Sequence, residues 1–168
     1  MPKLAPYLRD LDATSAYRLL SLPERDRCGI PLSQVIESAE ELGQLRSELR
    51  ALPSRGASPL GDAPDKLTID FTREALVLLR HTEPYGGTTA ELETPHLTGG
   101  VSGSSTTLGF RMRVRRPPSN TPAFAAVVPY CYPVIVDRSK ANMVVFSIND
   151  RAIFATRLTS PIAANVSD

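Results

Sequence analysis

Two histidines, His81 and His96, are the side chains of this sequence with the clearest capacity for metal binding or acid–base chemistry. Carboxylates lie near both in the chain, with Glu83 beside the first and Glu91 and Glu93 shortly before the second. If one hairpin brought the histidines together, a zinc ion would still need three or four ligands in tetrahedral geometry. No pair of histidines or cysteines has the spacing of a zinc motif. We therefore expect two solvated histidines, and keep a small hydrolase or metal-dependent enzyme as an alternative.

The common motifs of nucleophilic and phosphate chemistry are missing from the sequence. No G-x-S-x-G turn of a hydrolase occurs, and the similar stretch Gly100–Gly103 falls in an expected hairpin instead of preceding a helix. The pairs Gly86-Gly87 and Gly99-Gly100 also precede strands, whereas a phosphate loop opens a helix. We therefore predict a protein that is not an enzyme, with no catalytic residue, no metal and no cofactor.

The segment from Thr106 to Arg116 alternates in polarity, as expected of a β-strand with one buried face. Its apolar positions are Leu108, Phe110, Met112 and Val114, and its polar positions include Arg111, Arg113 and Arg115, with Arg116 at the end. In one interpretation the arginines are a solvated face paired with Glu91 and Glu93 on the neighbouring strand. In the other they bind an acidic partner protein, because arginine suits bidentate contact with carboxylates.

Two tyrosines and a glycine turn are further candidates for partner contact. Tyr130 and Tyr132 flank Cys131 between two prolines, which are typical of edge strands and strand ends. Such a pair could anchor a partner, or it could be half-buried core with its hydroxyls in water. The turn that contains Tyr85, Gly86 and Gly87 and the loop 117–122 would complete the partner surface.

The two cysteines, Cys28 and Cys131, leave the redox state open. They fit two buried thiols, or one disulfide that ties the N-terminal segment to the central sheet. A bridge across so long a loop would contribute on the order of 4 kcal/mol in the chain-entropy description. It would also require an oxidising compartment.

The composition is that of an ordinary globular protein. Hydrophobic residues make up 42% and charged residues 22%, and the net charge of +1 gives no electrostatic reason to expect nucleic acid as a partner. No apolar run is long enough to cross a membrane, so we expect no membrane insertion. No signal peptide is visible, which fits either a cytoplasmic protein or a mature region whose signal has been removed.

The helices and strands expected from the sequence predict an α+β fold. It is a single, sandwich-like, antiparallel β-rich domain of six to eight strands with one amphipathic helix. That helix covers about 38–52, because a capping box at Ser38 and Glu41 precedes a leucine stripe. A strand is expected over 67–71, and 75–79 fits a buried strand or a competing helix. Residues 1–29 are expected as an N-terminal arm with a short helix from Ala13 to Leu22, 30–158 as the domain, and 159–168 as a flexible tail.

Several of these segments together resemble the C-terminal domain family of the protease-complex accessory subunit PrcB, over roughly residues 33–146. The resemblance rests on Ile69-Asp70-Phe71, the strand 75–79, the Pro-x-Gly-Gly turn at 84–87 and V-V-P-Y-x-Y-P-V-I-V at 127–136. The chain departs from the family pattern at Tyr85 and Thr88, where the family tends to have threonine and an aromatic residue. The resemblance implies a non-catalytic, mostly extracytoplasmic domain that supports or binds another protein.

The residues and the resemblance lead to one main functional hypothesis. We expect a non-enzymatic protein-binding or accessory domain whose partner is another protein, in a complex that it stabilises. A self-associating structural subunit, joined through a sheet edge, is a further alternative and would make a homo-oligomer.

Overall fold

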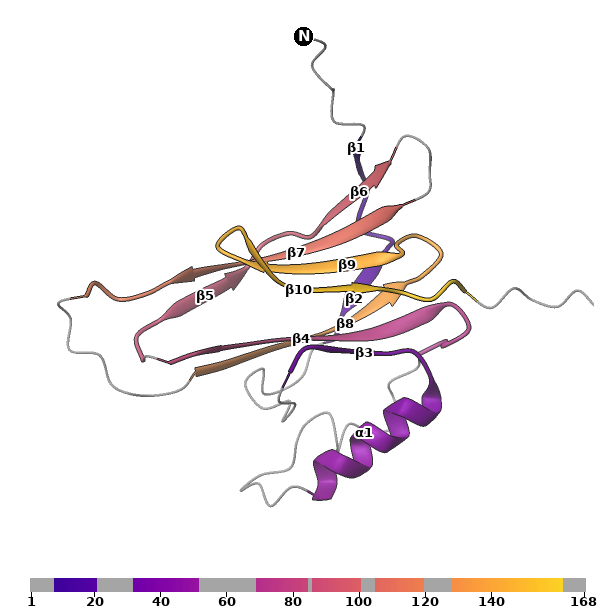
Figure 1. Cartoon of the computed structure of the whole chain (residues 1–168), viewed down its shortest axis with the longest axis horizontal. Helices are drawn as coiled ribbons and strands as arrows, with labels where there is room; N and C mark the ends of the chain where they lie inside the picture. The colour runs from indigo at the N-terminus through magenta and orange to yellow at the C-terminus, as the bar shows by residue number, and fades with distance from the viewer. Residues whose placement is uncertain are drawn as a thin grey trace, which may run out of the picture.

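The structure is a computed structural model that describes residues 8–20, 32–51, 69–84, 86–100, 105–119 and 128–161. In chain order the elements are β1 (Leu8–Leu11), β2 (Tyr17–Leu19), β3 (Gln34–Ile36), α1 (Ala39–Ala51), β4 (Glu74–Glu83), β5 (Thr89–Leu92), β6 (His96–Gly100), β7 (Thr106–Arg115), β8 (Val128–Asp137), β9 (Met143–Ile148) and β10 (Arg151–Arg157). The fold is mostly β, with two sheets and a single short helix among the described residues (Figure 1).

The strands form two sheets, here named sheet A and sheet B. Sheet A has the order β1-β6-β7-β9-β10, and β5 lies beyond β6 along the same edge of β7. Sheet B has the order β2-β8-β4-β3. All strand pairs are antiparallel except β7 with β9, which are parallel, so the predicted antiparallel β-rich fold has one parallel pair.

The main core lies between the two sheets. Sheet A contributes the apolar positions of β7, of which Phe110 is fully buried, together with Phe146 of β9. Sheet B contributes alternate residues of β4 and β8, such as Val77 and Val134. Tyr17 of β2 packs edge-on against Phe110, with ring centroids 5.7 Å apart. The alternation seen in the sequence of β7 is therefore confirmed as the division between core and solvent.

A smaller core lies between α1 and the outer face of sheet B. Figure 1 shows α1 below the strands. The leucine stripe of α1, including Leu42, Leu45 and Leu49, packs against this face. Ser38 caps the helix by accepting a hydrogen bond from the amide of Glu41 at 3.1 Å. The Glu41 carboxylate accepts from the amide of Glu37 at 2.8 Å, so the return bond of the cap forms one residue earlier than a capping box predicts.

The N-terminal segment differs from its expectation. The helix predicted from Ala13 is wrong over the described residues 13–20, where a turn leads into β2. β1 pairs with β6 and β2 pairs with β8, so the segment contributes one short strand to each sheet. These pairings raise the count to ten strands in the described part of the chain, compared with six to eight expected.

Other local expectations were resolved by pairing between distant strands. The run 75–79 is part of strand β4 and not a helix, because β3 and β8 pair with it on either side. Ile69 and Asp70 are not in a strand, while 67 and 68 lie outside the described residues. The amide of Thr159, expected in a flexible tail, donates to the Glu37 carboxylate at 3.1 Å.

Strand β8 runs continuously through both prolines and lies inside sheet B, between β2 and β4. The two prolines had indicated an edge strand or strand ends. The carbonyl of Pro133 accepts a hydrogen bond from the amide of Leu20 at 3.0 Å, so the nitrogen of Pro133 also faces the β2 side of β8. β2 ends there at Leu19, and the missing N–H therefore removes no bond from its ladder.

Among the described residues, no helix is long and apolar enough to span a membrane.

Candidate functional site

The exposed arginines of β7 lie in a row along the outer face of sheet A. Arg111, Arg113 and Arg115 alternate with core residues and are all exposed, as the sequence predicts. In register beside them are Ser147 of β9 and Glu91 of β5. No helix of the described chain covers this face, because α1 lies on the outer face of sheet B. We name these three side chains the arginine row.

Only the middle arginine of the row forms ion pairs among the described residues. The Arg113 guanidinium lies 3.2 Å from the Glu93 carboxylate and 3.7 Å from that of Asp150. The expected pairing with Glu93 is therefore present, whereas no ion pair of Glu91 is seen. Arg111 and Arg115 have no acidic partner within the described part of the chain, so their guanidinium groups are available to solvent or to another molecule.

Arg116 does not continue the row. It has the parity of the core positions, and its guanidinium reaches Glu83 at the end of β4 while the side chain stays 55% exposed. The two nitrogens Nε and Nη2 of Arg116 each donate to a Glu83 carboxylate oxygen at 2.9 Å. His81 Nε2 lies 2.7 Å from Glu83 Oε1. The Glu83 side chain is only 1% exposed. Glu83, His81 and Arg116 therefore form a polar cluster at the end of the sandwich, beyond the apolar core residues of β4 and β7.

The electrostatics of this cluster follow from its hydrogen bonds. The paired hydrogen bonds from Arg116 hold the pKa of the Glu83 carboxyl below its ordinary value, against the opposing effect of burial, and His81 adds to the lowering. The same contact raises the pKa of Arg116. A buried carboxylate held ionised by an arginine is a stable ion pair and is not poised to exchange a proton near neutral pH. Nothing in the local sequence predicts this burial, because a glutamate at a strand end is ordinarily in solvent.

The two histidines do not converge. His81 belongs to sheet B and points toward the sandwich interior, whereas His96 pairs with Gly109 in sheet A and is exposed on its outer face. The connection from β4 to β5 crosses between the sheets, so the hairpin that would have joined the histidines does not form. No group of three potential metal ligands occurs within the described residues.

The predicted glycine turn and one of the tyrosines meet at this same end of the sandwich. Gly87 has a φ of 79°, which an L-residue adopts at a cost, and a Cβ there would lie 3.8 Å from Pro117 Cγ. The Tyr130 hydroxyl donates to the carbonyl of Thr88 at 3.2 Å. Gly86 lies in the turn, while Tyr85 and residues 120–122 are outside the described residues. The turn, Tyr130 and the end of β7 are thus brought together, as the partner-surface prediction needs.

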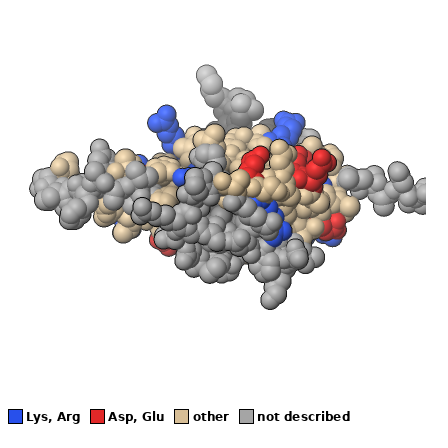
Figure 2. All heavy atoms as spheres, turned by 90° about the horizontal axis from the view of Figure 1, so that it is seen from below, with Lys and Arg blue, Asp and Glu red and all other residues tan. Residues whose placement is uncertain are grey.

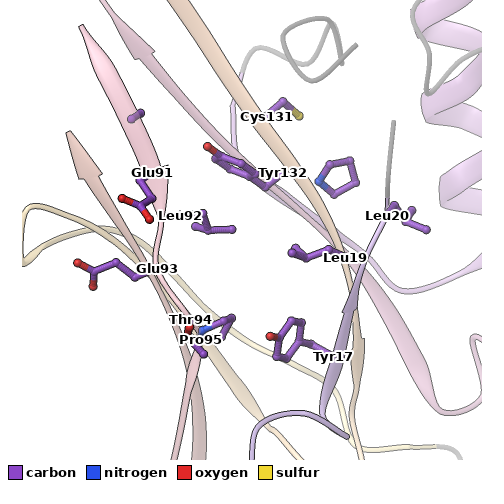
Figure 3. A pocket seen from close by; sticks show the side chains of 12 residues that line it. Tyr17, Leu19, Leu20, Glu91, Leu92, Glu93, Thr94, Pro95, Cys131 and Tyr132 are labelled. Carbon is purple, nitrogen blue, oxygen red and sulfur yellow. The ribbon is translucent and has the colours of Figure 1, made fainter. Parts of the chain in front are cut away.

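Tyr132 faces a different feature, a cleft of about 520 Å³ on the open side of the sandwich. The cleft lies between β5 of sheet A and the β2–β8 side of sheet B. Figure 3 shows Tyr17, Leu19, Leu92 and Tyr132 bordering it, while the carboxylates of Glu91 and Glu93 point away from its middle. Both tyrosines are half-buried against the main core, which agrees with the core interpretation of the pair. The cleft was not predicted, because it joins strands that are far apart in the sequence.

Cys131 is buried on the outer face of sheet B, in the core beneath α1. Cys28 lies outside the described residues. The disulfide between them stays a prediction.

The face opposite the arginine row has a different charge pattern. Figure 2 views the molecule from the side of α1, and the described acidic and basic side chains there are scattered and of both signs. Among the described side chains in this view, no ordered row of one charge is seen.

Comparisons of this chain with protein-family models, with curated proteins and with solved structures found no match. Functional inference therefore rests on the geometry of the arginine row, the adjoining turn and the cleft.

Proposed function

We propose that this chain is a non-enzymatic protein-binding domain that holds an acidic partner against the outer face of sheet A. The observation that carries the proposal is the arginine row: three exposed guanidinium groups on a face that no described helix covers, two of them without an acidic partner among the described residues. Alternate side chains on a strand are about 7 Å apart, so the row offers evenly spaced bidentate sites to carboxylates.

Stability alone does not account for the row. An exposed sheet face accepts many polar residues, and exposed ion pairs typically contribute only about 0.2–1 kcal/mol. The overall charge of the chain is close to neutral, at +1, so the row is a local concentration of charge. Recognition of a matching acidic surface requires positive charges in a fixed arrangement, which the arginine row supplies.

The partner in this proposal is another protein, and the role is that of an accessory domain that stabilises a complex. The resemblance to the PrcB C-terminal domain family accords with that role and stays part of the proposal. If that resemblance holds, the domain works outside the cytoplasm.

Affinity capture with charge-reversal variants tests the proposal. The full chain, immobilised, is exposed to lysate of its source organism and crosslinked, and the crosslinked residues are mapped by mass spectrometry. We expect a saturable partner with crosslinks beside β7, retention that falls at least tenfold for Arg111→Glu or Arg115→Glu, and weaker capture at high salt.

Lys140→Glu is the matched control, because it makes the same charge change at an exposed site on the turn after β8. Equal retention by wild type and both row variants would refute the proposal, as would equal loss from the control variant. A captured partner whose crosslinks map only to the α1 side would also refute it.

A further inference from the structure

The cleft beside β5 contains a strand edge whose outward backbone groups have no strand partner among the described residues. Glu93 donates its amide to the carbonyl of Arg111 at 2.8 Å, so the odd-numbered residues of β5 direct their backbone groups toward β7. The backbone groups of Ala90 and Leu92 must then point the opposite way. Nothing in the described chain pairs with that side of β5, because β1 pairs only with β6.

The side chains around this edge fit one particular kind of occupant. An added strand would direct alternate residues into the cleft, where Tyr17, Leu19, Leu92 and Tyr132 form an apolar lining. Its other residues would lie on the outer face of sheet A, beside Glu91, which is exposed. The charged residues of the described lining are Glu91 and Glu93, and Glu93 is already paired with Arg113. Glu91 is exposed and has no ion pair among the described residues, so its carboxylate favours a basic residue opposite it.

We propose that the free edge of β5 binds an extended segment of a partner protein by strand addition, with apolar residues in the cleft alternating with a lysine or arginine opposite Glu91. Main-chain hydrogen bonds to Ala90 and Leu92 hold the segment, and the alternate side chains select it. Cross-strand opposite charges stabilise such pairs. The free edge is on the side of β5 away from β7, and Glu91 lies in register between it and Arg113 of the arginine row. The proposal does not depend on what binds the arginine row.

The direct test is amide hydrogen exchange in the full chain, measured by NMR with and without a short synthetic peptide in which valine and lysine alternate. We expect the exchange of the Ala90 and Leu92 amides to slow at least tenfold when the peptide binds. The Glu91 amide faces β7 and serves as the internal control, with protection that the peptide leaves unchanged. Binding without protection of Ala90 and Leu92, or no binding at all, would overturn the proposal.

Two variants separate the backbone contribution from the charge contribution. Ala90→Pro removes the N–H that faces the free edge and leaves the β5–β7 bonds intact, so peptide affinity should fall at least tenfold. Glu91→Lys should weaken the valine–lysine peptide about threefold to tenfold and strengthen its valine–glutamate counterpart. The second variant keeps the test valid if Ala90→Pro does not fold.

Unchanged affinity in both variants would place the peptide elsewhere and refute the proposal. Sedimentation of the chain alone provides the remaining check. If the chain forms dimers that Ala90→Pro abolishes, then a second copy occupies the edge and the proposed partner segment is wrong.

Discussion

On the outer face of sheet B, Leu76, Leu78 and Ile135 lie beneath the leucines of α1. On the outer face of sheet A, the corresponding surface of β7 carries the arginine row, and no described helix lies over it. Both faces belong to the same sandwich and share the core between the sheets. The difference shows where the sequence is constrained by folding and where it is not.

The comparison also separates neighbouring residues of one strand. Arg115 and Arg116 are adjacent in the sequence, yet the first is exposed on the outer face and the second donates to a buried carboxylate. A sheet sends successive side chains to opposite sides, so the two arginines face different environments despite their identical chemistry. Substitutions on the covered face, on the uncovered face and at Arg116 should therefore differ in how much they lower the free energy of unfolding.

The largest effect is expected on the covered face. Leu45→Ala removes buried side-chain volume between α1 and sheet B, and should lower the free energy of unfolding by about 2–4 kcal/mol. Urea unfolding of both proteins measures the difference. Glu48→Ala, at an exposed position of the same helix, is the control and should stay within about 0.5 kcal/mol of wild type. Similar losses from both changes would contradict a special role for the packing of Leu45, because alanine is at least as good a helix former as either residue.

The next effect distinguishes the two adjacent arginines. Arg116→Ala leaves the buried Glu83 carboxylate with His81 as its one side-chain partner among the described residues, and should lower the free energy of unfolding by about 1–3 kcal/mol. Arg115→Ala should change it by less than about 0.5 kcal/mol. The same urea titration serves both variants. If the two substitutions were equally mild, the cluster would contribute nothing to stability.

The pH dependence of the Arg116→Ala effect sharpens this prediction. Because the folded protein lowers the pKa of Glu83 below 4.5, its ionised form stabilises the fold fully above that pH. This contribution is lost as the pH falls through the lowered pKa. The difference in unfolding free energy between wild type and Arg116→Ala should therefore be constant near neutrality and shrink below about pH 4.5. Urea titrations at several pH values measure it, and a difference that grows in acid would contradict the assignment.

Much of the layered fold was predictable from local patterns, because the alternation of β7 and the leucine stripe of α1 each record which side is buried. The helix expected at Ala13 shows the limit of such patterns. Its residues favour a helix locally, but pairing with β8 and burial of Ala16 select a turn and a strand instead. Local propensity was overridden by contacts with residues more than a hundred positions away.

The candidate site was predictable only where it lies on one strand. The arginine row follows from the parity of β7, and its exposure was confirmed. The cleft and the burial of Glu83 depend on how sheet A faces sheet B, which no local spacing records. The alternative in which His81 and His96 converge is wrong for the same reason, because the connection between them crosses from one sheet to the other.

A smaller effect is expected at the start of the covering helix. Ser38→Ala removes the oxygen that accepts from the Glu41 amide, and should lower the free energy of unfolding by about 1 kcal/mol. Ser47→Ala is the control within the same helix, because its hydroxyl only donates to the carbonyl of Gly43, and alanine favours the helix there. Thermal or urea unfolding should place the first variant below wild type and the second at or above it. The reverse order would show that the cap is not formed in solution.

The smallest effect on stability is expected at the arginine row itself. Arg111 is exposed and has no acidic partner among the described residues, so Arg111→Ala should change the free energy of unfolding by less than about 0.5 kcal/mol. The free energy of unfolding of this variant tests whether the arginine row is needed for folding. A loss above about 1 kcal/mol would assign the row a structural role and remove the main support for partner binding. A neutral result, together with weakened partner capture by Arg111→Glu, would mean that the uncovered face is free to recognise a partner because folding does not depend on it.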